Sequence, residues 1–190
     1  MLELMRNAKE LFQYAIGGFL PVMISMVFSV LYLSYNDKNI AYILLISLLL
    51  VFIICYVSGS YLIDKIAERE NFMNEVVNQG IQNSLDNLMN IYINNESNND
   101  INANRNVEDE GREQMIHIME VQNIVITLCN TIAVIAYFAC LYVLYLYLRK
   151  SKRSTSTIIA YILILGNILS DAFSLSSGFI HNMIYKIGII

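Results

Sequence analysis

The sequence predicts an all-α membrane protein with four transmembrane helices in two antiparallel hairpins, in which helices two and three continue into a polar extramembrane helical hairpin. Two observations lead to this fold class. Apolar residues make up 56% of the 190 residues and charged residues only 15%. The charges gather in the first ten residues, the middle third and one short basic cluster, so four long stretches are nearly free of charge. Each stretch exceeds the about 20 residues with which a helix crosses a hydrocarbon core of about 30 Å.

The first of the two predicted hairpins is an N-terminal transmembrane hairpin in residues 1–63. Its spans, residues 11–35 and 39–63, contain no charged side chain. The Asn/Asp turn between them, residues 36–39, is so short that the two helices must be antiparallel. A cleaved signal peptide is the alternative for the first run, but the run is too long and no small-residue cleavage site precedes the turn. Pro21 removes a backbone hydrogen bond in this span and should kink it.

A second transmembrane hairpin is expected in residues 121–190. Its spans are residues 121–148, which carry no charge, and residues 156–180, in which Asp171 is the only charged side chain. Residues 149–153, Arg-Lys-Ser-Lys-Arg, connect the two spans and form the densest positive charge in the chain.

The basic connection also gives an orientation. The positive-inside rule places residues 149–153 in the cytoplasm or its topological equivalent. With four spans, the turn at residues 36–39 lies on that same side, and both termini and the middle segment lie on the other. The total of Lys and Arg residues, 7 outside against 5 inside, opposes this orientation. We give more weight to the local density in a short loop, because the rule is strongest there.

The middle segment, residues 64–120, is predicted to be a polar helical hairpin. After span two, apolar residues continue at a largely 3- and 4-residue spacing, which is typical of an amphipathic helix. Residues 94–111 are rich in Asn, Asp and Glu and are expected to form a solvated, mobile tip. A helical pattern restarts at Met115 and leads into span three. The apolar stripe needs a facing surface, and the residues expected to contact a partner are Val77, Ile81, Leu85 and Leu88.

Polar residues inside the spans are the candidate functional residues. Asp171 comes first, because an ionised side chain in the bilayer costs about 2.5 kcal/mol or more. Helical spacing puts Asn167 and Ser174 on its stripe of span four, while span three offers Asn130 and Thr131. Two interpretations stay open. In one, these residues join helices to each other or to a partner; in the other, Asp171 handles protons or cations beside a wet path.

Several classes of function lack support in the sequence. The net charge of −4 offers no basic surface for nucleic acid. No hydrolase, nucleotide-binding or paired-carboxylate motif occurs, so we expect no enzyme and no cofactor. His117 and His181 would lie about 10 Å apart along straight helices, too far to share a metal ion. The three cysteines lie in apolar stretches without metal-binding spacing and are expected to be buried hydrophobes.

Together these features favour a non-enzymatic structural or assembly subunit of a larger membrane complex. The expected partners are the lipid bilayer and other membrane protein subunits, or further copies of the same chain. The alternative is an oligomeric ion or proton pathway with Asp171 as its titrating group. The scarcity of charged residues in the spans favours the first hypothesis, since a single acidic residue gives little support for a proton relay.

Overall fold

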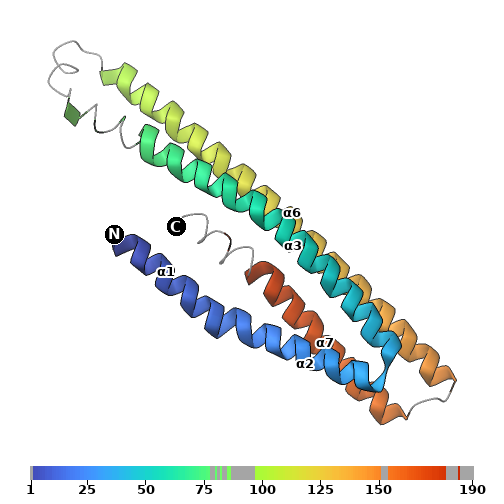
Figure 1. The fold of residues 1–190 in the computed structure, drawn as a ribbon. Coiled ribbons are helices and arrows are strands. Elements are labelled where there is room, and N and C mark those ends of the chain that lie inside the picture. The colour runs from blue at the N-terminus through green and yellow to red at the C-terminus, as the bar shows by residue number, and fades with distance from the viewer. Residues whose placement is uncertain are drawn as a thin grey trace.

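The computed structural model describes residues 2–77, 97–150 and 154–178, together with residues 80, 82, 85, 86 and 184. The described elements are helical throughout and contain no strand. In chain order (Figure 1) they are α1 (Leu2–Tyr14), η1 (Ala15–Phe19), α2 (Leu20–Asn36), α3 (Lys38–Phe72), η2 (Met73–Val77), α6 (Ser97–Arg149) and α7 (Thr155–Gly178).

The all-helical class and the four long apolar helices are confirmed. Four helices are long and apolar enough to cross a membrane, with mean hydropathy between 1.9 and 3.0 in their most apolar stretches. Three of these helices extend beyond the expected spans, covering Ala8–Asn36, Lys38–Val76 and Glu108–Arg149. The described part of the fourth, Thr155–Gly178, begins one residue before its expected span and ends within it. An uncharged run sets the minimum length of a span, because the helix continues for as long as its backbone hydrogen bonds are made.

A π-helical turn lies just before Pro21, where the sequence predicts a kink. Residues 15–19 form η1, and the backbone N–H of Leu20 donates to the carbonyl of Ala15, five residues earlier. Proline lacks an N–H, and its ring clashes with the carbonyl four residues before it. A single π turn just ahead of Pro21 accommodates both effects within a continuous helix.

The turn between α2 and α3 is shorter than expected. Asp37 alone, with φ −151° and ψ 102°, separates the two helices. Its side chain accepts hydrogen bonds from the backbone N–H groups of Asn39 and Ile40, at 3.0 and 3.3 Å. Asp37 is therefore the N-cap of α3, which satisfies two of the amide groups that a helix start leaves without a partner.

Two clusters of buried residues hold the helices together. The first draws on α2, α3, α6 and α7 and includes Leu33, Ile40, Leu144, Tyr161 and Leu165. The second lies mainly between α3 and α6 and includes Val51, Cys55, Leu62, Ile66, Ile118, Val125 and Cys129. The α2–α3 turn and the end of α6 consequently meet at one end of the bundle (Figure 1).

Helices α3 and α6 lie side by side and run in opposite directions (Figure 1). Cys55 faces Cys129, and just beyond the end of α3 the side chain of Met73, in η2, lies against Gly111. The α3–α6 pair extends past the ends of α1 and α7.

The part of the Asn-rich tip that the structure describes is helical. Because α6 begins at Ser97, residues 97–111 continue the helix of span three rather than forming an irregular loop. Residues 94–96 lie outside the described residues. Propagating an existing helix adds one hydrogen bond for each residue fixed, so a polar segment joined to a long stable helix can remain helical.

Candidate functional site

Asp171 joins α7 to α2. The hydroxyl group of Ser25 donates a hydrogen bond to Oδ2 of Asp171 at 2.8 Å. Asp171 is half-buried and Ser25 is exposed, so the pair lies at the outer surface of the bundle, where the two helices meet. The sequence does not indicate a role for Ser25, because an isolated serine in a span gives no periodic signal.

Asn130 forms a separate link, between α6 and α7. Its Oδ1 accepts a hydrogen bond of 2.7 Å from the hydroxyl of Ser176, which is only 1% exposed. Thr131 is turned away from this link: it is exposed, and its hydroxyl donates to the carbonyl of Thr127 on its own helix. The bonds of Asp171 and Asn130 thus hold α7 from two directions, towards α2 and towards α6.

Asn167 and Ser174 lie on the outer face of α7. Both side chains are exposed, and so is that of Ser170 between them. We call these three residues the outer polar face of α7; their spacing of three and four residues puts them on one side of the helix. No hydrogen bond joins their side chains to any residue that the structure describes.

Comparison with models of known protein families and with curated proteins finds no match for this chain.

Asp37 forms a second polar cluster, at the end of the bundle. The hydroxyl of Tyr147 on α6 donates to Asp37 Oδ1 at 3.2 Å, and Nδ2 of Asn39 donates to that hydroxyl oxygen at 2.9 Å. Asp37 is only 7% exposed. In the sequence Asp37 is recognisable only as a turn residue, and no sequence pattern pairs it with Tyr147. The cluster ties the start of α3 to the end of α6.

Two of the cysteines lie close together between α3 and α6. The Sγ atoms of Cys55 and Cys129 are 3.7 Å apart, and both residues are buried. Cys140 is buried in the other core cluster. Burial of all three agrees with their expected character as small hydrophobes, but their spacing in the sequence did not indicate the pairing of two thiols.

Among the residues that the structure describes, no group of three or more His, Cys, Asp or Glu side chains could hold a metal ion. His117 is exposed on α6, while His181 lies outside the described residues.

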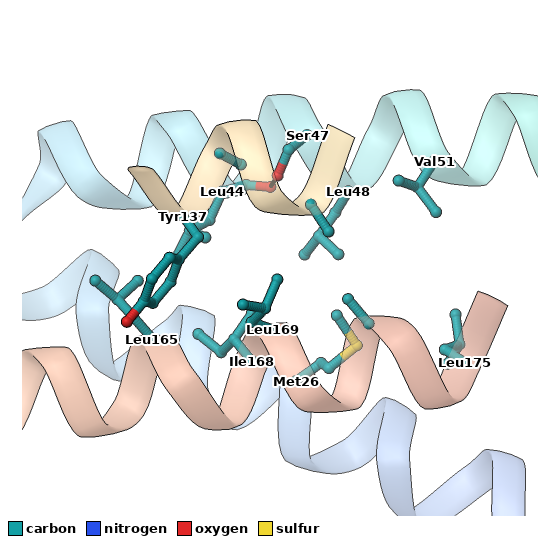
Figure 2. Close-up of a pocket in the computed structure, with 13 residues that line it drawn as sticks. Met26, Leu44, Ser47, Leu48, Val51, Tyr137, Leu165, Ile168, Leu169 and Leu175 are labelled. Carbon is teal, nitrogen blue, oxygen red and sulfur yellow. Dashed lines mark hydrogen bonds between the residues drawn. The ribbon is translucent and has the colours of Figure 1, made fainter. Parts of the chain in front are cut away.

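An apolar cavity of about 30 Å³ lies between α2, α3, α6 and α7 (Figure 2). Its lining includes Met26, Leu44, Leu48, Tyr137 and Ile168. The hydroxyl of Ser47, also in the lining, donates to the carbonyl of Leu44 on its own helix. The lining therefore offers few polar groups that could bind and orient a substrate.

The stability of the α2–α7 contact can be tested at Ser25. Replacing Ser25 with Ala removes the donor to Asp171, and we expect the free energy of unfolding in detergent to fall by about 0.6 to 1.7 kcal/mol. Asp171→Asn keeps an oxygen acceptor and should have a smaller effect. The matched control is Ser58→Ala, because Ser58 bonds only to the carbonyl of Ile54 on its own helix. Equal losses in Ser25→Ala and Ser58→Ala would show that the contact contributes nothing.

Proposed function

We propose that the protein is a non-enzymatic structural or assembly subunit of a larger membrane complex. The observation that carries this proposal is the outer polar face of α7, which is exposed and without a hydrogen-bond partner among the described residues. Counted from Thr155 at about 1.5 Å per residue, Asn167 lies about 18 Å along α7, near the middle of a core of about 30 Å.

An amide at that depth needs a partner. Moving an amide from water into hydrocarbon without a compensating hydrogen bond costs about 4 to 8 kcal/mol. The amide of Asn167 does not titrate, so no change of protonation state relieves this cost. A polar surface of another chain would supply the missing hydrogen bonds, so the exposed amide favours assembly inside the membrane.

Nine hydroxyl groups elsewhere in the spans make a contrast with this face. Seven hydroxyl groups bond to carbonyls of their own helix and so can face lipid at little cost: those of Ser34, Ser47, Ser58, Ser60, Thr127, Thr131 and Ser177. Ser25 and Ser176 bond to neighbouring helices. The outer polar face of α7 differs from both groups, which is why we assign it to a contact between chains.

We further propose that the arms formed by residues 64–77 and 97–120 project from the membrane as a helical hairpin. Ion pairs on their surfaces suit an aqueous setting: Lys65 with Glu68, Arg69 with Glu70, and Asp109 with Arg112. The arms cover part of their own apolar stripe, because Ile66 and Ile118 are buried. This internal packing leaves a smaller apolar surface for partners than the sequence suggested.

The expected partner-contact residues of this hairpin are only partly described. Leu85 is 61% exposed, which suits a contact with another protein. Ile81 and Leu88, and the side chain of Val77, lie outside what the structure describes. Other exposed apolar residues on the arms extend the proposed contact surface: Val76, Ile116 and Met119.

The proposed orientation keeps the basic connection, residues 149–153, on the cytoplasmic side. The contact between Asp37 and Tyr147 supports a common side for the α2–α3 turn and the end of α6. Labelling a single cysteine at Ser154→Cys from each side of sealed vesicles tests this orientation, since Ser154 is exposed just after the basic connection.

Extraction in a mild detergent tests the assembly function. We expect the protein to elute as a particle larger than one chain plus its detergent, either with other proteins or with copies of itself. Light scattering combined with protein mass spectrometry gives the mass and composition of the particle. A stable, well-folded single chain, obtained at every detergent concentration and also in lipid nanodiscs, would contradict the proposal.

A second candidate function is an oligomeric ion or proton pathway. It is favoured by the position of Asp171, which is half-buried at the α2–α7 surface and bonded through Oδ2 to Ser25. An oligomer that enclosed this surface could hydrate the carboxylate. In reconstituted vesicles, Asp171→Asn removes the titratable group and should abolish any proton or cation flux. Flux that persists unchanged in this variant would exclude Asp171 as the conducting group.

A further inference from the structure

The outer polar face of α7 has a composition that suits contact with its own copy. An Asn side chain both donates and accepts hydrogen bonds, and so does a serine hydroxyl. Copies with the same membrane orientation are related by an axis along the membrane normal, which brings identical residues together at one depth. Asn167, Ser170 and Ser174 can meet their own counterparts without repulsion between like charges.

The shape of the face also permits close approach. Gly166, beside Asn167, has open space around it: an added Cβ there would meet no atom within 4 Å. Glycine and serine allow the backbones of two membrane helices to approach closely, and such small residues are enriched where membrane helices pack. Asp171 lies to one side of the face and is already bonded to Ser25 of α2, so two carboxylates need not meet at the centre.

We propose that the outer polar face of α7 is the contact between two copies of this chain, with the Asn167 amides of the two copies hydrogen-bonded to each other. This inference rests on the proposed assembly function and makes it specific. Ser170, one turn farther along the face, would lie near the twofold axis. Ile135, an exposed residue of α6, does not belong to this face.

Two measurements test the proposal. First, Asn167→Leu removes the hydrogen-bonding groups but keeps a similar volume. We expect dimer formation in lipid nanodiscs or vesicles, followed by energy transfer between labelled copies, to weaken about 3- to 30-fold. Asn123→Leu is the matched control, because Asn123 is also an exposed asparagine but lies on α6. It should leave the dimer unchanged.

Second, a short bismaleimide should join two copies that carry Ser170→Cys. The background for this experiment replaces the three buried native cysteines with alanine. Ile135→Cys is the control and should give little covalent dimer. If this background fails to fold, Ser170→Cys in the otherwise native chain serves instead, since the native thiols are buried between helices.

The outcomes separate this proposal from the assembly function. A dimer that resists Asn167→Leu, or that crosslinks through Ile135→Cys rather than Ser170→Cys, would overturn the assigned face. Loss of a different co-purifying protein in Asn167→Leu, without any self-association, would overturn the second-copy assignment but uphold the assembly function. An isolated monomer under all conditions would overturn both.

Discussion

Treatment of the native protein with a membrane-permeant oxidant, such as molecular iodine, is expected to join α3 to α6 through a disulfide bond between Cys55 and Cys129. Their Sγ atoms are 3.7 Å apart, and a disulfide bond is about 2.05 Å long, so a shift of less than about 2 Å brings them together. Each thiol loses one proton and one electron, and the oxidant takes up both electrons. Since 74 positions separate the two residues, the chain-entropy account gives a stabilisation of up to about 4.5 kcal/mol.

Disulfide formation is measured by alkylating the free thiols of the denatured protein and determining the intact mass by mass spectrometry. We expect three added groups before oxidation and one afterwards, the remaining group lying on Cys140 in the other core cluster. Cys129→Ala is the matched control and should accept two groups with or without oxidant. A disulfide that involves Cys140, or three free thiols after thorough oxidation, would contradict the packing of α3 against α6.

Replacing Asp37 with Ala is expected to lower the free energy of unfolding by about 2 to 5 kcal/mol. The variant loses the cap at the start of α3, which contributes about 0.5 to 2 kcal/mol. It also loses the hydrogen bond from Tyr147 to the carboxylate, and bonds to charged groups contribute about 1.5 to 3 kcal/mol. Denaturant titration in detergent, followed by circular dichroism, measures the change.

Two further variants divide the effect of Asp37 into its parts. Asp37→Asn retains an oxygen that can cap α3, so we expect it to lose less than half as much stability as Asp37→Ala. Tyr147→Phe keeps the cap and removes the bond between α6 and the turn, so its loss should lie between the two. If Asp37→Ala were no more destabilising than Asp37→Asn, the capping role would be refuted.

Local properties of the sequence were enough to predict the class of fold. Four stretches nearly free of charge, with their lengths, predicted four helices capable of crossing a membrane, and the structure has them. Such predictions succeed because the transfer of each side chain into hydrocarbon depends mainly on that side chain alone. For the same reason, local composition does not predict where a helix begins or ends. Helix α6, for example, begins at Ser97, inside a segment whose composition suggested an irregular tip.

The π turn ahead of Pro21 shows a second limit of prediction from sequence. Proline in a span predicts a kink, and the reason is the missing N–H. In the structure the ring of Tyr14 lies beside Gly18, within the π turn, and beside Gly178 of α7. A sequence pattern contains no such contacts.

For the candidate functional residues too, the sequence predicted one part of the arrangement and the tertiary structure decided the rest. Sequence periodicity alone placed Asn167, Asp171 and Ser174 on one stripe of their helix, because an α-helix turns by a fixed angle at each residue. Which stripe faces a neighbour, and at what height, depends on how four helices rotate and slide against one another to fill their cores. Only the tertiary structure, therefore, paired Asp171 with Ser25, Asn130 with Ser176 and Cys55 with Cys129, and left Asn167 on the outside.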